Sequence, residues 1–212
     1  MRLIGMLDSP FVRRVAISLE FLGVPFTHEA VSVFSTFAKF QGINPVVKAP
    51  TLVCDDGEVL MESTLILQYI EAVHSKGATL WSHDPATLQH EMRAVSLALA
   101  ACERAAQYIY EKNLRPTALQ YDVWLTRVKG QLLAACAGLE TQLKTYPSLA
   151  AAPCSQAVIM AAVAWQFIQS MLADLVPAAW HPTLVALSAR MEATPQFRKY
   201  PLDGPGVPGL ST

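Results

Sequence analysis

The chain changes character near residue 80, and this change constrains the fold more than any other feature of the sequence. Before it, short apolar runs alternate with amphipathic stretches, whereas from Thr87 to Met191 the chain is rich in Ala, Leu and Gln and has a helical pattern almost throughout. Residues 76–86 contain Gly77 and Pro85 and show no periodicity, which is typical of a linker. We therefore expect two domains, residues 1–75 of mixed α and β structure and residues 87–212 built from helices alone.

The first domain has the pattern of a βαβ unit followed by a β-hairpin and a helix. The hairpin is indicated by Asp55-Asp56-Gly57, a turn sequence between two short apolar runs. Gly23 ends the first helix in the position where a left-handed residue is favoured. The expected elements are a strand at 2–6, a helix at 10–22, a strand within 25–33, a short helix or loop at 34–41, strands at 51–54 and 58–61, and a helix at 63–74.

The second domain is expected to be a helical bundle. Its helical pattern is broken at residues 113–116, 146–153 and 177–182. Residues 157–168 are apolar on nearly all sides, which predicts a helix at the centre of the bundle. Residues 200–212 hold several prolines and glycines, and we expect an extended, poorly ordered tail there.

Composition and charge exclude several classes of protein. Hydrophobic residues make up 52% of the 212 positions and charged residues 16%, which indicates a folded chain with a sizeable core. Lys and Arg number 16 against 17 Asp and Glu, so no net field attracts nucleic acid or an anionic membrane. The longest apolar run, residues 157–165, is too short to span a membrane, and no secretory signal is visible. We expect no nucleic-acid or membrane partner.

The cysteines and histidines indicate neither disulfides nor a metal site. The four cysteines are widely spaced and form no CxxC, as expected of buried free thiols in a reducing compartment. A cytoplasmic location is therefore predicted. The five histidines lack the spacing of metal ligands, so we expect no metal.

Ser9-Pro10 marks the point where the first strand passes into the first helix. Ser is a favoured N-cap and Pro a favoured first helical residue, so the simplest interpretation is a helix cap. The alternative is that Ser9 also holds a reactive anion, because the N–H groups and the dipole of a helix N-terminus favour negative charge. A hydroxyl in this position is suited to stabilising a thiolate.

Two further segments of the first domain have both a structural and a functional interpretation. Pro50 begins a strand in either interpretation; if the Ala49–Pro50 bond is cis, the Ala49 backbone turns outward and is free to pair with a peptide. Ser63 is expected to cap the next helix, with Glu62 in solvent. In the functional interpretation the helix N-terminus at Ser63 takes a carboxylate and Glu62 pairs with an ammonium.

With these segments together, the chain resembles a glutathione S-transferase of the bacterial, serine-type kind along essentially its whole length. The motifs that carry the resemblance are Ser-Pro-Phe-Val-Arg-Arg-Val from residue 9, the Asn44-Pro45 turn, Lys48-Ala49-Pro50 and Glu62-Ser63. The resemblance implies a thioredoxin-like first domain, glutathione as co-substrate without a metal, and a two-fold homodimer. It also implies conjugation of glutathione to a small apolar electrophile, a detoxification reaction.

The resemblance assigns roles residue by residue. Ser9 occupies the catalytic position that activates the glutathione sulfur, with Phe11 packed beside it, and Pro50 is the cis proline. The other glutathione-binding residues would be Ala49 through its backbone, Glu62 and Ser63 at the γ-glutamyl head group, and Lys48 at the glycyl carboxylate, where a solvated surface lysine is an equal alternative. The residues expected in the electrophile pocket are Met6, Phe11, Tyr108 and Trp165.

The sequence departs from the family pattern at two positions and leaves the reaction open. Val158 stands where the family often has an Asp in the capping box of its central helix, and Ala49 where Val or Ile is usual. The Val158 departure bears on stability and folding, not on chemistry. The Ala49 departure should matter little, because the expected contact runs through the Ala49 backbone. An isomerase or peroxidase that uses the same glutathione site is one alternative activity. A non-catalytic interaction protein with this fold is another.

Overall fold

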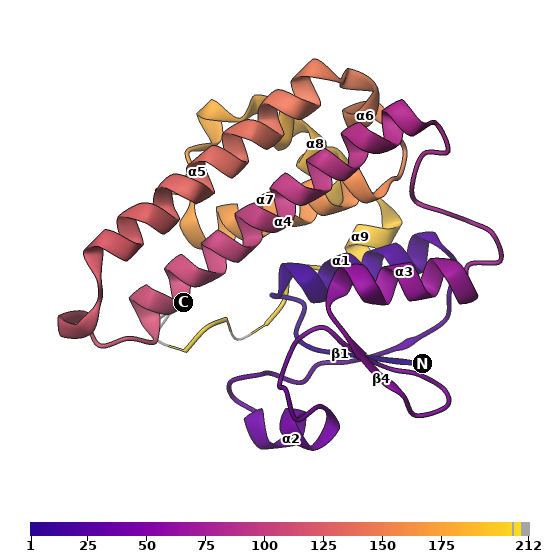
Figure 1. Cartoon of the computed structure of the whole chain (residues 1–212), viewed down its shortest axis with the longest axis horizontal. Helices are drawn as coiled ribbons and strands as arrows, with labels where there is room; N and C mark the ends of the chain where they lie inside the picture. The colour runs from indigo at the N-terminus through magenta and orange to yellow at the C-terminus, as the bar shows by residue number, and fades with distance from the viewer. Residues whose placement is uncertain (205, 209–212) are drawn as a thin grey trace. The chain divides into compact units, whose positions relative to one another are not determined.

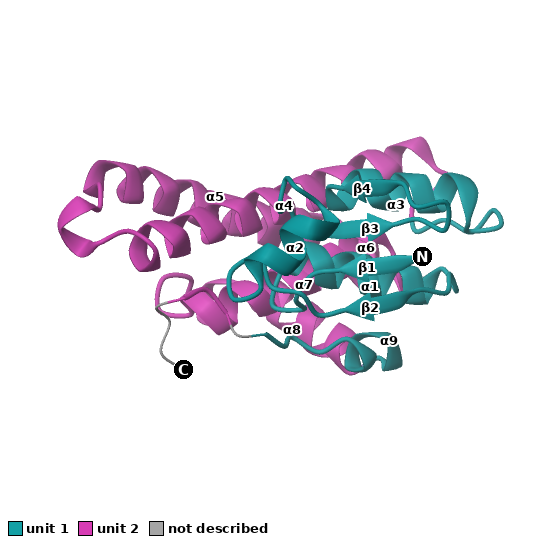
Figure 2. Ribbon diagram, turned by 90° about the horizontal axis from the view of Figure 1, so that it is seen from below, with its two compact units in different colours: residues 1–80, 194–204 teal, residues 81–193, 205–212 magenta. Residues whose placement is uncertain are grey.

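The computed structural model describes residues 1–204 and 206–208, which form two compact units (Figure 2). Unit 1 contains residues 1–80 and 194–204, and unit 2 contains residues 81–193 and the described residues after 204. The sequence places everything from residue 87 onward in the second domain, whereas residues 194–204 group with unit 1. Residue 205 and residues 209–212 of the expected tail lie outside the described residues.

Unit 1 is built on a four-stranded mixed sheet with the strand order β2-β1-β3-β4. Strand β1 pairs in parallel with β2 and antiparallel with β3, and β3 and β4 form the predicted hairpin. Leu3 lies opposite His28 on one side and Leu52 on the other. Strands β1 (Arg2–Ile4), β3 (Thr51–Val53) and β4 (Val59–Met61) are shorter than expected. Strand β2 (Thr27–Glu29) lies within the predicted range of 25–33.

Helices cover both faces of this sheet. Helix α1 (Pro10–Phe21) and helix α3 (Ser63–Val73) lie side by side on one face, and α2 (Phe37–Ile43) lies on the other (Figure 1). Phe40 of α2 packs in a buried cluster with Ile4 and Val31. The order is therefore βαβ, then a hairpin, then a helix, as the sequence predicts.

The C-terminal segment of unit 1 packs along α1. Helix α9 (Pro195–Lys199) contacts α1, and the Lys199 ammonium forms an ion pair of 2.8 Å with Glu20. Near the other end of α1, Gly204 passes so close to the Asp8 side chain that a Cβ there would collide with it. Part of the predicted extended tail is thus held against the helix that begins beside Ser9.

Unit 2 is all-helical within the described residues. The long helices α4 and α5 pack against each other, and α7 packs against α4 and α8. Helix α7 is the central helix that the sequence predicts, because nearly every side chain from Gln156 to Ile168 is buried. The helices are α4 (Pro85–Asn113), α5 (Asp122–Thr145), α6 (Pro147–Ala151), α7 (Gln156–Leu172) and α8 (Pro182–Glu192), with 3-10 turns at Thr117–Leu119 and Ala178–Trp180.

Three details of unit 2 differ from or refine the expectation. A short helix, α6, occupies the predicted break at 146–153, because Pro147 starts it and Pro153 follows it. Helix α4 starts at Pro85, so the irregular linker is shorter than 76–86. Ser155 caps α7, and its Oγ accepts the N–H of the buried Val158 at 3.4 Å. No helix of the described residues is long and apolar enough to cross a membrane.

Candidate functional site

Ser9 caps α1, as its sequence position predicts. Its backbone is extended, with φ −74° and ψ 118°, and its Oγ accepts the N–H of Val12 at a long 3.4 Å. A serine hydroxyl has one hydrogen to donate besides the lone pairs that accept. Among the described residues that hydrogen has no acceptor, and the side chain is only half-buried. Ser9 can therefore donate to an anion while it caps the helix.

Gly5 brings the first turn of α1 close to the segment before β3. Its φ is +141°, and a Cβ on it would lie 2.6 Å from a Val12 methyl group and 3.3 Å from the Cβ of Ala49. Only a residue without a side chain fits this contact and this backbone conformation. Val12 follows Ser9 by three residues, so Ala49 lies near the end of α1 that Ser9 caps.

The Ala49–Pro50 peptide bond is cis, as the family resemblance implies. The backbone N–H of Ala49 has no hydrogen-bond partner within residues 1–204 and 206–208. Ala49 itself is half-buried. A peptide ligand that approaches this segment would therefore meet an unused backbone donor.

Asn44 holds the segment that leads to Ala49. This buried residue donates from Nδ2 to Thr51 Oγ1 at 2.8 Å and accepts the N–H of Val46 at 3.0 Å. Thr51 Oγ1 in turn donates to the carbonyl of Lys48 at 2.6 Å. Both ends of the stretch are thereby fixed, while the Lys48 side chain is exposed. The solvated and the ligand-binding interpretations of Lys48 are both compatible with that exposure.

The sequence prediction for the cap of α3 is wrong, because Glu62 rather than Ser63 is the N-cap. Glu62 Oε2 accepts the N–H groups of Thr64 at 3.1 Å and Leu65 at 3.3 Å. To do so Glu62 adopts φ +76°, a conformation that costs free energy in any residue other than glycine. Such strain at a non-glycine residue is more frequent at functional sites than elsewhere.

This geometry leaves a donor and an acceptor side by side at the start of α3. The N–H of Ser63, the first helical residue, has no partner in the described part of the chain. Among the described residues, only the Ser63 hydroxyl engages Glu62 Oε1, at 3.4 Å. An amino-acid head group needs this pair of functions, a donor for its carboxylate and an anion for its ammonium.

Two arginines of α1, to which the sequence prediction gave no role of their own, are fully buried. Arg14 Nη1 donates to Ser63 Oγ at 3.3 Å and to Thr64 Oγ1 at 3.1 Å. Arg13 Nε donates to the Tyr200 carbonyl at 2.8 Å. The available signal was that Arg13 and Arg14 lie between Val12 and Val15, where the pattern of an amphipathic helix leaves little room for two solvated charges.

The residues expected in an electrophile pocket are divided between the two units. Met6 and Phe11 belong to unit 1 and are half-buried on either side of Ser9 in the sequence. Tyr108 and Trp165 belong to unit 2. Trp165 is 5% exposed, and its ring lies 5.3 Å from that of His181, as expected of a core side chain.

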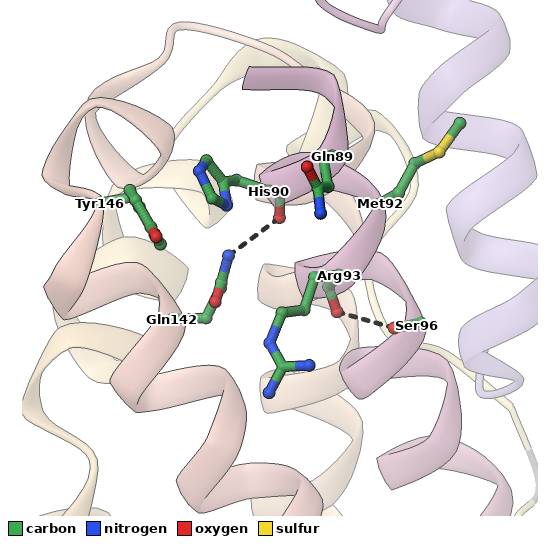
Figure 3. A pocket seen from close by; sticks show the side chains of 7 residues that line it. All are labelled: Gln89, His90, Met92, Arg93, Ser96, Gln142 and Tyr146. Carbon is green, nitrogen blue, oxygen red and sulfur yellow. Dashed lines mark hydrogen bonds between the residues drawn. The ribbon is translucent and has the colours of Figure 1, made fainter. Parts of the chain in front are cut away.

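A separate cavity of about 540 Å³ lies between α4 and α5 in unit 2 (Figure 3). His90 stacks on Tyr146 with a ring separation of 3.7 Å, and Gln142 Nε2 donates to the His90 carbonyl at 3.2 Å. The remaining lining residues are Gln89, Met92, Arg93 and Ser96. None of the predicted site residues lines this cavity.

The described residues provide no metal cluster, and two of the four cysteine thiols have a raised pKa. No group of three or more His, Cys, Asp or Glu suited to a metal occurs among them. All four cysteines are free, but Cys154 is only half-buried, whereas the sequence predicts four buried thiols. Burial raises the pKa of the Cys54 thiol and raises that of Cys136 to about 12, so both stay protonated at neutral pH and neither is suited to act as a nucleophile.

Unit 1, which contains this candidate site, is similar in sequence to known proteins. Residues 3–77 match the family model "Glutathione S-transferase, N-terminal domain". A probable maleylacetoacetate isomerase of Caenorhabditis elegans is 38% identical over 90 residues, which are 42% of this chain and 41% of the worm protein. The matches span less than half the length of the first curated relatives.

Solved structures extend the likeness to nearly the whole chain. A glutathione S-transferase of Methylobacterium radiotolerans in complex with glutathione sulfonate is 25% identical, with a TM-score of 0.81, and the match covers 100% of this chain and 96% of that protein. A glutathione transferase family member of Pseudomonas fluorescens with bound glutathione is 26% identical, with a TM-score of 0.79 and coverage of 94% and 97%. Both solved structures hold glutathione or its sulfonate.

Proposed function

We propose that this chain, which belongs to the glutathione S-transferase superfamily, binds glutathione on unit 1 and conjugates its thiolate to a small apolar electrophile. The observation that carries the proposal is a set of polar groups in this unit that retain hydrogen-bonding capacity among the described residues. Ser9 Oγ, the Ala49 N–H, the Ser63 N–H and Glu62 Oε1 remain available to a ligand. They match, in chain order, the thiol, the cysteinyl backbone and the γ-glutamyl head group of the peptide.

Each part of the peptide then has an assigned partner. The γ-glutamyl carboxylate receives hydrogen bonds from Ser63, and the ammonium pairs with Glu62. The backbone of Ala49, before the cis Pro50, pairs with the cysteinyl unit. Phe11 packs beside the sulfur, and Lys48 extends from the surface toward the glycyl carboxylate.

Ser9 and the N-terminus of α1 stabilise the thiolate. An unperturbed thiol has a pKa of about 8.5, and lowering it by two units requires about 2.7 kcal/mol in favour of the anion. A charge-assisted hydrogen bond and a helix N-terminus provide free energy of this order. The thiol proton passes to solvent, the sulfur forms a bond to the electrophilic carbon, and the leaving group departs with its electron pair.

The test is Ser9→Ala, with Ser155→Ala as the matched control. Each serine caps a helix through a hydrogen bond of 3.4 Å, but only Ser9 lies at the proposed site. We expect S9A to bind glutathione, to raise the apparent pKa of the bound thiol by one unit or more, and to slow conjugation at least tenfold at pH 6.5. S155A should keep the pH profile of the unaltered protein. Full activity of S9A with an unchanged pH profile would contradict the role of Ser9.

The apolar character of the electrophile is part of the proposal. Met6 and Phe11 offer half-buried apolar side chains next to Ser9 in unit 1. Tyr108 and Trp165 remain predictions for unit 2, and the burial of Trp165 favours a core role for it. Conjugation of an apolar electrophile yields a more polar product, which is consistent with detoxification.

Isomerisation is the second candidate activity, and the name of the worm relative, a probable maleylacetoacetate isomerase, favours it. In such a reaction glutathione would add to the substrate and leave again, so no thiol would be consumed. In conjugation one thiol disappears for each product molecule. Thiol consumption during turnover of maleylacetoacetate and of a generic aryl halide distinguishes the two, and a protein with neither activity would be a binding protein.

We also propose that the protein is a cytoplasmic homodimer. Leu65 and Val73 of α3 are large apolar side chains that are 59% and 60% exposed, and a dimer contact on this helix would cover them. The free cysteines are consistent with a reducing compartment. Light scattering should give twice the chain mass of 23.1 kDa.

A further inference from the structure

The cavity between α4 and α5 is a candidate binding site that the proposed function does not use. All of its lining residues belong to unit 2, whereas the residues proposed to bind glutathione belong to unit 1. Its volume of about 540 Å³ lies within the range of about 300–1,000 Å³ that is typical of sites for small organic molecules. The chemistry of the lining residues therefore indicates which kind of ligand the cavity accepts.

Gln142 on α5 brings a hydrogen-bond acceptor to the cavity. The residue is only 6% exposed, and its Nε2 donates to the His90 carbonyl at 3.2 Å. The amide oxygen, Oε1, accepts no hydrogen bond from residues 1–204 and 206–208. Every fully buried side-chain nitrogen or oxygen of these residues has a partner, so Oε1 keeps some exposure, and Gln142 lines the cavity. A ligand with an N–H group can supply the partner that Oε1 lacks.

Arg93 on α4 gives the cavity its positive charge. Its guanidinium forms no hydrogen bond or ion pair with any described residue, although its carbonyl accepts the Ser96 hydroxyl at 2.8 Å (Figure 3). The cavity lining contains no Asp or Glu. The neighbouring carboxylate of Glu91 is buried and accepts the N–H of Ser82 at 2.8 Å instead. An anionic group is therefore favoured in this cavity.

His90 and Tyr146 add a flat aromatic surface. Their ring centroids are 3.7 Å apart and their planes are inclined by 22°, so the rings stack on each other. Both residues are only half-buried, which leaves part of the pair open to a third ring. Because the His90 carbonyl also binds the Gln142 amide, a ring on this pair lies near the acceptor (Figure 3).

We infer that the cavity binds a nucleoside monophosphate whose base carries an exocyclic amine. The base stacks on the His90–Tyr146 pair, its amine donates to Gln142 Oε1, and its phosphate binds Arg93. Adenine and cytosine carry such an amine on a planar ring. Arg93 is the one Arg or Lys in the lining, which favours a single phosphate group. The inference is independent of glutathione binding, because no residue proposed for that site lines the cavity.

The first experiment measures the Kd of four ligands for the full chain by titration calorimetry. Adenosine monophosphate has all three features, inosine monophosphate has a carbonyl in place of the amine, adenosine lacks the phosphate, and inorganic phosphate lacks the base. We expect adenosine monophosphate to bind about tenfold more tightly than each of the others. Equal binding of any of the three would overturn the inference. Saturating glutathione should change the Kd of adenosine monophosphate less than twofold, and competition between the two would also overturn it.

The second experiment uses Arg93→Met, with Arg127→Met as the matched control. Both arginines are exposed in unit 2, but only Arg93 lines the cavity. R93M should raise the Kd of adenosine monophosphate about tenfold and that of adenosine less than twofold, whereas R127M should change neither by more than twofold. Equal effects of R93M and R127M would contradict a specific phosphate contact.

Gln142→Met tests the acceptor. In Q142M the preference for adenosine monophosphate over inosine monophosphate should fall below twofold, and a preserved preference would overturn the role of Gln142. If Q142M does not fold, the comparison of the two nucleotides in the unaltered protein tests the same acceptor.

Light scattering distinguishes a nucleotide from a second copy of the chain as the occupant of this face. R93M should have the same mass as the unaltered protein, with and without adenosine monophosphate. A lower mass for R93M would show that the cavity is part of a contact between copies and would overturn the inference.

Discussion

The helices of the two units differ in how the N–H groups at their N-termini are hydrogen-bonded. In unit 2, Glu140 Oε1 and Oε2 accept the N–H groups of Thr183 and Leu184 at the start of α8, each at 2.9 Å. At the start of α4, Asp84 accepts the N–H of Thr87 at 2.9 Å. In unit 1 and among the described residues, the Val12 N–H at the start of α1 has a long hydrogen bond of 3.4 Å to Ser9, and the first N–H of α3 has no partner.

The difference indicates that a helix N-terminus can bind a ligand only where its N–H donors are left without strong partners and are accessible. Every helix has the same dipole and the same unsatisfied N–H groups at its start. Helix α7 illustrates the second condition: its cap, Ser155, is as loosely bonded as Ser9 but is only 4% exposed. A ligand cannot reach that cap, whereas Ser9 is half-buried and accessible.

The largest effect should come from Glu140→Ala, which removes the acceptor of two N–H groups in unit 2. Glu140 is 8% exposed, and hydrogen bonds to a buried charged group each contribute about 1.5–3 kcal/mol. We expect the free energy of unfolding in urea to fall by about 3 kcal/mol, with Glu103→Ala on exposed surface as a control that changes it by less than about 0.5 kcal/mol. Conjugation by the folded E140A protein should persist. A loss below about 1 kcal/mol would contradict the view that these N–H groups depend on Glu140.

A smaller effect on stability is expected for Ser9→Ala and Ser155→Ala. The two caps have the same hydrogen-bond length, so each substitution should lower the free energy of unfolding by about 1 kcal/mol. Only S9A should lose conjugation. Equal losses of activity in both variants would show that the serines act through stability alone, and the contrast between the units would disappear.

The smallest effect concerns pH and the cap of α4. Hydrogen bonds from the Thr87 hydroxyl and backbone N–H lower the pKa of Asp84 below its ordinary value. Ionised Asp84 therefore stabilises the folded state fully above that ordinary value, about 3.9, and this contribution is lost as pH falls through the lower pKa of the folded state. Asp84→Ala should have a lower free energy of unfolding than the unaltered protein at pH 7. This difference should become smaller below about pH 4. For S155A the difference in free energy of unfolding should not change with pH, since a serine does not titrate. A difference for D84A that is constant with pH would contradict the capping role of ionised Asp84.

The sequence predicted well those parts of the fold that depend on residues close together in the chain. Ser9-Pro10 at the start of α1 and Asp55-Asp56-Gly57 between β3 and β4 lie where the sequence places them. The apolar stretch 157–168 is the buried centre of unit 2. Strand lengths were overestimated, because apolar runs continue past the few residues that pair in the ladder. The grouping of residues 194–204 with unit 1 depends on contacts to α1 that no local pattern encodes.

The candidate site was predicted in part for the same reason. Ser9, Ala49, Pro50 and Ser63 were identified from short motifs, but the capping role of Glu62 requires φ +76°, which only the neighbouring structure can impose. Arg14 was missed because its partners, Ser63 and Thr64, lie 49 and 50 residues away. Propensity and spacing report on neighbours along the chain, whereas a long charged side chain can be buried only if distant residues provide its acceptors.

The sequence by itself thus determined the two kinds of architecture, the start of α1 at Ser9-Pro10 and the order of the motifs that we propose to bind glutathione. These follow from apolar periodicity, proline and capping preferences, which act over a few residues. Only the tertiary structure decided which helix N-termini keep unused donors, that Glu62 rather than Ser63 caps α3, and that Arg14 lies behind Ser63. Those features depend on burial and on hydrogen bonds between distant segments, so they exist only once the chain has folded.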